Sequence, residues 1–302
     1  MTKFTILLGD CRETLQDIEP ESVQTCVTSP PYFGLRDYGH GDQIGMEETP
    51  EKFVTELVKV FGEVRRVLRD DGTIWLNLGD TYSSGNRTTT ENQTLRGAQD
   101  YGVSRPPPIE GVKPKDLIGI PWRVAFALQA DGWYLRQDII WHKPNPMPES
   151  VTDRCTKCHE YIFLLSKSLK YYYDHEAIKD PVKQDWGTRD RTDGKYHNEG
   201  SGLQPHGGLE KSYETANKRS VWTVTTKPYK DAHFATFPKK LIEPCILAGS
   251  KKGETVLDPF TGAGTTGLVS VEHGRNFLGC ELNPEYRKMA MGRIYNAQPY
   301  LI

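Results

Sequence analysis

Two features typical of exported and membrane proteins are missing from this sequence of 302 residues. No apolar run approaches the roughly 20 residues that a membrane-spanning helix needs. The apolar stretch at the N-terminus, residues 4–8, is too short for a signal peptide. With 26% charged residues, the composition predicts a soluble, cytoplasmic protein without membrane contact. The length allows one sizeable α/β domain with insertions, or two small domains.

Cysteine is also scarce, with six residues spread along the chain, and without an export signal no disulfide framework is expected. Cys155 and Cys158 precede His159 in a C-x-x-C-H pattern, which is typical of haem attachment or of half a zinc site. A second cysteine pair is lacking, so a tetrahedral zinc site would require His159 and a distant histidine. We therefore favour reduced thiols and expect no metal centre.

The sequence also lacks a large excess of charge of either sign. The net charge is −2 and the pI is about 6.5, which disfavours a protein that coats nucleic acid. The average conceals a positive segment. Residues 183–240 contain eleven Lys and Arg against seven Asp and Glu, and Trp186, Tyr196, Tyr213 and Trp222 stand among them. Because DNA contact uses cations for phosphates and other side chains for bases, we interpret this segment as DNA-binding rather than as a solvated surface.

Apolar and β-branched runs alternate with helical patterns along the chain. Strands are expected at residues 4–8, 22–27 and 73–78, and a helix from Pro50 to a stop at Asp71-Gly72. This alternation predicts a mainly parallel sheet with helices on its faces. The further expected elements are a helix at 116–130, strands at 138–141 and 161–165, a helix at 241–246, a strand at 255–258, a helix at 264–273, a strand at 276–281 and a helix from Pro284.

Antiparallel edge strands are expected from residues 138–141 and 161–165 together with 171–173. Periodicity fails at 82–115 and again at 183–232, which is Gly-rich and polar. Long loops in compact domains are usually functional or disordered, and the second stretch resembles an insertion. No internal repeat is found.

The tetrapeptide Ser29-Pro30-Pro31-Tyr32 follows a β-branched run. Its two prolines fix φ and lack N–H groups, so the carbonyls and the serine hydroxyl before them are rigid acceptors. Such a turn can grip an exocyclic NH2 group. Tyr32 adds a flat face for an extruded base, and this combination suits chemistry on a nucleobase amine.

A second motif lies between the expected strand and helix near residue 260. Residues 258–267 read Asp-Pro-Phe-Thr-Gly-Ala-Gly-Thr-Thr-Gly and contain G-x-G-x-x-G, and Glu281 ends the next strand. Glycine allows a ligand close to the backbone, the helix offers free N–H groups, and the acid can grip ribose hydroxyls. A dinucleotide would need a second mononucleotide-binding half, whereas only a helix and a short tail follow. Adenosylmethionine therefore fits better than NAD.

These two motifs, in this order, resemble those of the β-class DNA amino-methyltransferases over nearly the whole chain. In that family the glycine motif follows the catalytic SPPY or DPPY, with the target-recognition segment between them. The resemblance implies a Rossmann-like, adenosylmethionine-dependent methyltransferase fold with a circularly permuted motif order, a mostly parallel sheet and an antiparallel edge hairpin. It implies a catalytic half at 1–182, which includes the long loop 82–115, a recognition insertion at 183–232, and a cofactor-binding half of the same domain at 233–302.

The same resemblance implies S-adenosyl-L-methionine as the cofactor. Gly9-Asp10-Cys11 resembles the family's N-terminal cofactor element, whose acid lies near the adenine, and residues 233–238 resemble the element that closes over the methionine end. The residues implied to line the pocket are Asp10, Phe234, Asp258, Phe260, Gly262, Gly264, Thr265 and Glu281.

An aromatic amine is a weak nucleophile because its lone pair is delocalised into the ring. Acceptors that pull its hydrogens out of the ring plane favour attack on the sulfonium methyl, and Ser29 and Pro30 are the candidates. Tyr32 would stack on the flipped base, and Trp141 and Lys143 are further candidates for holding the base or its phosphate. No covalent nucleophile is required. Pro244-Cys245 is similar to the nucleophile of cytosine-C5 methyltransferases, but Cys245 falls on the apolar face of a helix and is interpreted as core.

The sequence therefore predicts a site-specific methyltransferase that acts on double-stranded DNA. Within the family, serine in the first position of the tetrapeptide is associated more with cytosine N4 than with adenine N6, so we favour cytosine N4 and keep adenine N6 as the alternative. Other hypotheses are an RNA or protein-amide methyltransferase, a DNA-binding regulator without catalysis, and an NAD-dependent oxidoreductase. A homodimer, a cognate restriction endonuclease or none, and a bacterial or phage-infected host cell are compatible partners and settings.

Overall fold

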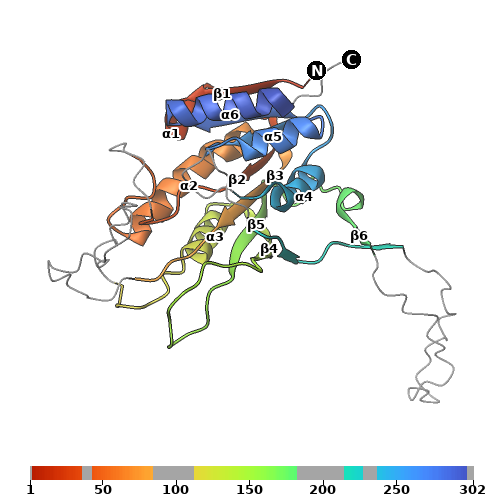
Figure 1. Ribbon diagram of the computed structural model, residues 1–302. Coiled ribbons are helices and arrows are strands. Elements are labelled where there is room, and N and C mark those ends of the chain that lie inside the picture. Colours follow the sequence, from red (N-terminus) through yellow and green to blue (C-terminus); the bar gives the residue numbers. More distant parts are fainter. Residues whose placement is uncertain (1, 36–42, 84–111, 182–213, 227–236, 298–302) are drawn as a thin grey trace, which may run out of the picture.

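The computed structural model describes residues 2–35, 43–83, 112–181, 214–226 and 237–297. Its main element is an eight-stranded sheet with the order β1-β10-β9-β2-β3-β5-β4-β8. Figure 1 labels β1 to β5 of this sheet among the surrounding helices. The strands are β1 (Phe4–Leu8), β2 (Val23–Thr28), β3 (Leu68–Leu78), β4 (Tyr134–His142), β5 (His159–Ser166), β8 (Val221–Thr223), β9 (Thr255–Asp258) and β10 (Asn276–Glu281). A separate short pair joins β6 (Asp180–Pro181) to β7 (Thr215–Ala216).

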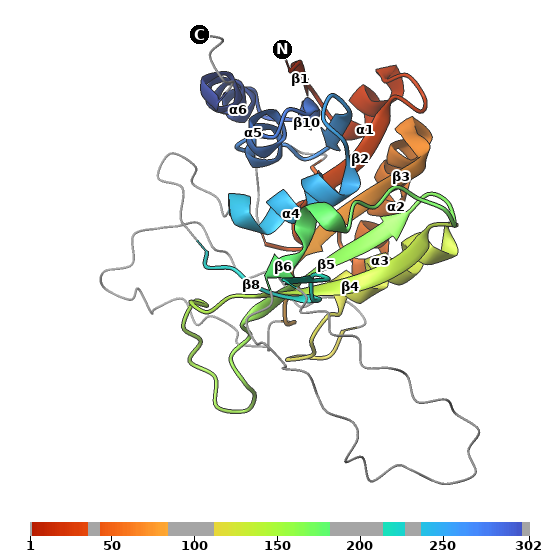
Figure 2. The same ribbon diagram turned by 90° about the vertical axis from the view of Figure 1, so that its right-hand side faces the viewer.

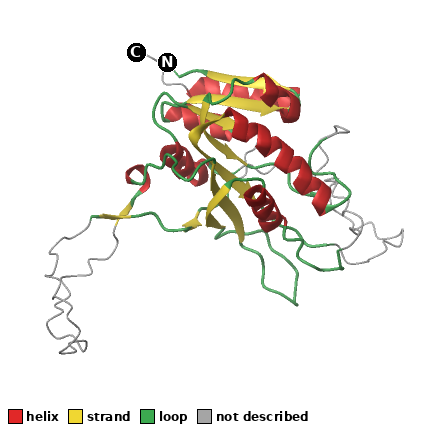
Figure 3. Cartoon of the chain, turned by 180° about the vertical axis from the view of Figure 1, so that it is seen from behind, coloured by secondary structure: helices red, strands yellow, loops and turns green. Residues whose placement is uncertain are grey.

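The helices are α1 (Cys11–Thr14), α2 (Pro50–Val67), α3 (Ile120–Ala130), α4 (Lys239–Gly249), α5 (Thr265–Glu272) and α6 (Pro284–Ala297), with short 3-10 turns at Leu15–Asp17 and Glu176–Ile178. Figure 3 shows helices on both sides of the sheet. Among the described residues, none of the helices is long and apolar enough to cross a membrane.

The strand pairing is mostly parallel. Strands β1, β10, β9, β2 and β3 run parallel to one another, β5 is antiparallel to both β3 and β4, and β8 pairs in parallel with β4. Strands β9 and β10 come from the C-terminal part of the chain yet lie between β1 and β2. The predicted α/β fold, with a mostly parallel sheet and an antiparallel hairpin, is confirmed.

The prediction that residues 171–173 form an edge strand is wrong. The edge beyond β4 is occupied by β8. Tyr173 instead stacks on Trp75, with ring centroids 6.1 Å apart, and packs against buried side chains on one face of the sheet. Its aromatic ring is therefore used for packing over the sheet, and its backbone does not extend the ladder.

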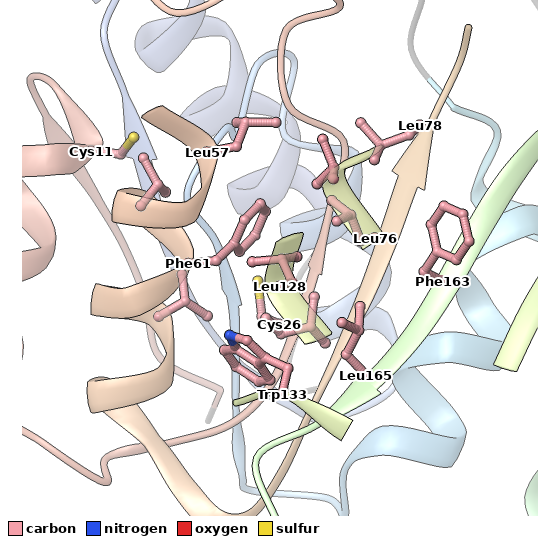
Figure 4. Packing of buried hydrophobic residues seen from close by; sticks show 14 of the residues in the cluster. Cys11, Cys26, Leu57, Phe61, Leu76, Leu78, Leu128, Trp133, Phe163 and Leu165 are labelled. Atoms are coloured by element: carbon pink, nitrogen blue, oxygen red, sulfur yellow. The ribbon is translucent and has the colours of Figure 1, made fainter. Parts of the chain in front are cut away.

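Alternating side chains on the central strands divide the core between two faces. Cys26 on β2 and Leu76 on β3 pack with α2 and α3 in the larger cluster, which Figure 4 shows from close by. Their neighbours Val27 and Trp75 belong to a second cluster with α4. A third, smaller cluster joins α5 and α6 to β1 and β10, and Figure 2 shows these four elements near one another.

Two helix boundaries differ from the sequence prediction. Helix α2 begins as expected at Pro50, where the Thr49 hydroxyl accepts a hydrogen bond from the Lys52 N–H, but it ends at Val67 rather than at Asp71-Gly72. It ends early because Leu68 already pairs with Val23 as the first residue of β3. Helix α3 begins at Ile120 rather than at residue 116.

Tertiary contacts explain the late start of α3. The Asp80 carboxylate, just beyond β3, accepts hydrogen bonds from the N–H groups of Gly119 and Ile120 at 3.0 and 3.1 Å. Gly119 adopts a left-handed conformation with φ +79°, which fits a residue without a Cβ. A carboxylate distant in sequence thus satisfies the free N–H groups of the first turn, which sequence periodicity could not indicate.

Much of the segment 183–232 lies outside the described residues, as does residue range 84–111 within the loop 82–115. The described end of the segment supplies β8, so part of it completes the central sheet. Trp222 on β8 is buried and lies 6.5 Å from Trp75 between ring centroids. The prediction that Trp222 contacts DNA is therefore wrong, because the ring is covered by the core. Trp186, Tyr196 and Tyr213 lie outside the described residues.

Candidate active site

The carboxyl ends of β2 and β9 lie next to each other in the middle of the sheet. After β2 the chain crosses one face of the sheet in α2, and after β9 it crosses the opposite face in α5. At such a reversal, α/β proteins bind ligands in the crevice outside the carboxyl ends of the strands, so a ligand is expected here. Both sequence motifs start there, because Ser29 follows β2 and Pro259 follows β9.

Asp258 joins the two motifs. Its Oδ1 accepts hydrogen bonds from the Thr28 hydroxyl at 2.6 Å and the Phe260 N–H at 3.1 Å, and its Oδ2 accepts one from the Thr266 hydroxyl at 2.6 Å. Complete burial raises the pKa of Asp258 to about 6 despite these hydrogen bonds. The carboxylate thus links the end of β2 to the glycine turn, residues 259–264, and both of its oxygens accept hydrogen bonds.

The two glycines of the turn serve different needs. Gly262 has φ +50°, and a Cβ built on it meets only the Phe260 carbonyl oxygen at 3.9 Å, so the space above it is open. Gly264 has φ +77°, and its Cβ would lie 2.7 Å from the Ala290 Cβ on α6. Thr265, the first residue of α5, is buried. Gly262 therefore leaves room for a ligand, whereas Gly264 allows the close packing of α5 and α6.

Two acids flank this turn. The Glu281 carboxylate accepts hydrogen bonds from the N–H groups of Gly262 at 2.7 Å and Asn283 at 2.8 Å, and burial raises its pKa. Asp10 caps α1 by accepting from the Arg12 N–H at 2.8 Å and forms an ion pair with the Arg12 guanidinium. Burial opposes ionisation of Asp10, but Arg12 outweighs it and lowers the pKa.

Three strand ends bring these groups together. Strands β1 and β10 pair in parallel up to Leu8 and Glu281, and the Gly9 N–H donates to the Glu281 carbonyl at 3.0 Å. Phe260 is half-buried and packs against the larger cluster. The structure therefore gathers Asp10, Phe260, Gly262 and Glu281 at one edge of the sheet, while Phe234 lies outside the described residues.

The tetrapeptide follows β2 directly. Pro30 is buried, and Ser29 and Pro31 are half-buried. The chain just after the tetrapeptide is held by a hydrogen bond of 2.8 Å from the Gly34 N–H to the Gly45 carbonyl. Tyr32, Phe33 and Gly79 help to line a small cavity beside the turn.

Tyr32 is held by Glu160 and Gly79. Its hydroxyl donates a hydrogen bond of 2.7 Å to Glu160 Oε2 on β5, and its ring lies directly against Gly79 beyond β3. Glu160 also accepts from the Asn77 amide at 3.3 Å and forms an ion pair with Lys143. In the sequence, Glu160 lies in His159-Glu160-Tyr161, which resembles a recurring stretch of the β-class amino-methyltransferases, but nothing in that stretch indicated a contact with Tyr32.

The other two candidate substrate-binding residues lie in this neighbourhood with different surroundings. Trp141 is buried, and its indole N–H donates to the Val224 carbonyl at 2.8 Å. The Lys143 ammonium lies 4.2 Å from the centre of the Trp141 ring. The ring is thus covered by the core and by Lys143.

The cysteines have ordinary surroundings. Cys245 is buried on α4 within the second cluster, and burial raises the pKa of its thiol, so its interpretation as a core residue is confirmed. Cys155 is exposed and Cys158 half-buried. Within the described ranges, no three His, Cys, Asp or Glu side chains are grouped as metal ligands.

Comparison with known proteins places these observations in a family. The family model described as DNA methylase, for N6 and N4 methyltransferases, matches residues 23–292. The Type II methyltransferase M.SmaI of Serratia marcescens is 50% identical over 289 residues, covering 96% of this chain and 90% of the relative. The Type II methyltransferase M.Cfr9I of Citrobacter freundii is 50% identical over 290 residues, covering 96% and 87%.

Solved structures show the same fold. The PvuII DNA methyltransferase, described as cytosine-N4-specific, aligns with a TM-score of 0.66 at 19% identity, covering 97% of this chain and 86% of that one. The putative DNA modification methylase TTHA0409 of Thermus thermophilus, solved in complex with S-adenosyl-L-methionine, aligns with a TM-score of 0.61 at 24% identity, covering 100% and 96%.

Proposed function

We infer the roles of the site residues from one premise: the chain belongs to the DNA methylase family of N6 and N4 amino-methyltransferases. It is an enzyme that transfers a methyl group from S-adenosyl-L-methionine to an exocyclic amino group of DNA. What this chain adds is the arrangement of its own residues around that reaction. The observation that carries the assignment of roles is the convergence of both motifs on the carboxyl ends of β2 and β9.

The residues at the β1, β9 and β10 ends fit the cofactor. The open space above Gly262 admits a ligand close to the backbone, and Glu281 presents a carboxylate beside it for ribose hydroxyls. Asp10 and Phe260 flank the same edge and are proposed to face the adenine. Thr265 and Phe234 are the other residues proposed to line the cofactor pocket. When bound, the cofactor supplies an electrophilic methyl group on a sulfonium.

Ser29 and Pro30 are proposed to hold the amine. The Ser29 hydroxyl and the Pro30 carbonyl accept its two hydrogens and draw them out of the ring plane, which directs the nitrogen lone pair toward the methyl group. Ser29 and Pro30 would thereby hold the amine nitrogen toward the methyl group that the bound cofactor would supply, and they would accept the proton that the amine must lose to solvent after transfer. Pro31 fixes the turn, and Tyr32 stacks on the extruded base.

Asp258 is proposed to act indirectly in cofactor binding. Its oxygens are occupied by Thr28, Phe260 and Thr266, so it sets the distance between the amine-holding turn and the glycine turn. Direct contact with the cofactor is not needed for this role. The geometry of methyl transfer depends on that distance, because both reacting groups are held by turns that Asp258 connects.

Cytosine N4 is the proposed target, with adenine N6 as the alternative. The supporting observations are the serine in the first position of the tetrapeptide and the shared fold with a cytosine-N4-specific enzyme. The test is to methylate bacterial genomic DNA with the purified protein, digest it to nucleosides and separate them by mass. N4-methylcytosine is expected. N6-methyladenine without N4-methylcytosine would overturn the choice of base.

The partners and setting follow from the relatives. We propose double-stranded DNA as the substrate and a restriction-modification setting in a bacterial or phage-infected cytoplasm, because the relatives are Type II methyltransferases of bacteria. The segment 183–232 is proposed to carry target recognition between the catalytic half, 1–182, and the cofactor-binding half, 233–302. A homodimer and a cognate endonuclease are proposed by analogy alone. Sequencing the modified bases in cells that express the chain would reveal the recognised site.

A further inference from the structure

We propose that Glu160 is a positioning residue, which acts through Tyr32 by fixing the plane of its ring for the extruded base. The proposal rests on the proposed stacking role of Tyr32 and adds a residue to that site. Glu160 lies on β5, 128 positions away from Tyr32 in the sequence. Glu160 is not adjacent to either motif in the sequence, so only the fold brings it to the site.

The two carboxylate oxygens of Glu160 have separate tasks. Oε2 accepts the hydrogen bond from the Tyr32 hydroxyl at 2.7 Å, a length typical of a strong, charge-assisted bond. Oε1 pairs with the Lys143 ammonium. The Glu160 and Lys143 side chains are only 15% and 19% exposed, so neither is a freely moving surface charge. Glu160 is thereby held in place when it receives the tyrosine hydroxyl.

The Cδ2–Cε2 edge of the Tyr32 ring is held by Gly79. A Cβ at position 79 would lie 2.5 Å from Tyr32 Cε2 and 3.1 Å from Cδ2 and Cζ, so the ring rests directly on the backbone. Asn77, two residues earlier, donates to Glu160 Oε2 at 3.3 Å and to the Tyr161 carbonyl at 3.1 Å. The tip of the ring and its edge are thus both constrained, and the ring has little freedom to rotate.

Lys143 serves Glu160 in this arrangement. Its backbone N–H donates to the Cys158 carbonyl at 2.7 Å, and its ammonium sits over the Trp141 ring. Trp141 pairs with Glu160 in the β4–β5 ladder, which brings both side chains to the same end of the hairpin. Because Glu160 already neutralises its charge, Lys143 supports the carboxylate and does not present a free cation to a DNA phosphate.

A fixed ring has a functional consequence. Ordering a side chain during binding consumes part of the interaction free energy, so a stacking surface that is ordered beforehand favours the extruded state of the base. Without Glu160, the Tyr32 ring must be ordered by the DNA at each turnover. The effect should appear in kcat and in base extrusion, while cofactor binding on the other side of the crevice is preserved.

The test is a double-mutant cycle of Glu160→Ala and Tyr32→Phe, with methyl transfer to genomic DNA as the readout. The cost of ordering one side chain predicts a fall in kcat/KM of about 2- to 10-fold for either single variant. If Glu160 acts through the Tyr32 hydroxyl, adding Glu160→Ala to Tyr32→Phe lowers kcat/KM little further. Independent, multiplicative losses would overturn the proposal, as would an unchanged kcat/KM in Glu160→Ala.

Three controls separate positioning from a general structural role. Glu160→Gln keeps an acceptor for Tyr32 and should recover most of the activity. Glu272→Ala breaks an ion pair with Lys239 away from the site and should leave kcat/KM unchanged. Glu160→Ala leaves Lys143 unpaired and should lower the melting temperature, so the variants are compared well below it. Binding of S-adenosylhomocysteine should be the same in Glu160→Ala and wild type, and loss of this binding together with activity would assign Glu160 to stability. Activity of the wild type on DNA tests the proposed function separately.

Discussion

Thr28 and Asp258 are joined by a buried hydrogen bond of 2.6 Å although 230 positions separate them in the chain. Thr28 immediately precedes the tetrapeptide, and Asp258 opens the glycine motif. One carboxylate therefore connects the two halves of the site, and the strand order places β9 next to β2 to make this possible. The circular permutation of the motifs has no effect on this contact, because the sheet brings the ends together whatever their order along the chain.

The first prediction concerns the pH dependence of stability. Burial raises the pKa of Asp258 to about 6 in the folded state, above its ordinary 3.8. The folded state therefore binds the Asp258 proton more tightly than the unfolded state does. This binding stabilises the folded protein fully at low pH, and the stabilisation is lost as the pH rises through about 6. The expected loss in the free energy of unfolding is on the order of 2–3 kcal/mol between about pH 4 and about pH 7.

Asp258→Asn isolates this effect, because an amide cannot ionise. Its oxygen can still accept from the Thr28 hydroxyl, and its NH2 group can donate to the Thr266 hydroxyl, which can itself donate to the Val27 carbonyl 3.3 Å away. Urea unfolding of both proteins at several pH values is the measurement. The difference between them should change with pH in the range where the carboxyl of the wild type titrates. A difference independent of pH would mean that Asp258 does not change its protonation in this range.

Replacing Ser29 by Ala should abolish most turnover and leave cofactor binding intact. The hydroxyl is a proposed acceptor for the amine, and loss of one such oriented group in an active site lowers kcat by about 100-fold or more. Methyl transfer and calorimetric titration with S-adenosylhomocysteine measure the two effects. A weakened titration with normal kcat would show that Ser29 had been given the wrong role.

Gly79→Ala should lower activity through Tyr32. The added Cβ would come within 2.5 Å of the Tyr32 ring and push it away from its position. Cofactor affinity should be unaffected, since Gly79 lies on the Tyr32 side of the crevice. Gly62→Ala is a matched control, because a Cβ there meets nothing within 4 Å. The idea fails if the two variants have the same kcat.

The two glycines of the turn should separate cofactor binding from stability. Gly262→Ala fills space left for the ligand and should weaken S-adenosylhomocysteine binding, with a backbone penalty of about 1–2 kcal/mol at positive φ. Gly264→Ala forces the new Cβ against Ala290 and should lower the melting temperature more. Calorimetry and thermal unfolding on the same samples compare them. The reverse ranking would contradict the division of roles.

Lys143→Met should not change the salt dependence of DNA binding. A cation that contacts a phosphate contributes about one unit to the slope of log K against log salt. Lys143 is neutralised by Glu160 within the protein, so the slope should remain that of the wild type while kcat falls. Fluorescence anisotropy of labelled DNA at several salt concentrations provides the slope. A decrease of about one unit in the magnitude of this slope would show that Lys143 contacts a DNA phosphate.

The local chemistry was readable from the sequence because it depends on short-range order. Ser29 to Tyr32 and Asp258 to Gly267 each lie within one strand-turn unit, and proline and glycine have the same conformational limits wherever they occur. Short runs rich in β-branched and apolar residues likewise indicated the strands at 4–8, 255–258 and 276–281, although β1, at the edge of the sheet, buries only Ile6.

Contacts between distant segments could not be read in the same way. Helix α3 begins where the Asp80 carboxylate caps it, and Trp222 turns inward because β8 takes the sheet edge. Glu160 became part of the site only through the register of β4 and β5 and the neighbouring β3. These outcomes depend on which strands pair, and one sequence carries no direct record of its pairing.

The two motifs and the chemistry they serve are therefore properties of the amino-acid order alone, because proline, glycine and carboxylate groups act over a few bonds. That Asp258 lies under Thr28 and that Glu160 meets the Tyr32 hydroxyl are properties of the assembled fold. The physical reason is that hydrogen bonds act only at about 3 Å, and chain segments 128 and 230 residues apart reach that distance only when the sheet assembles.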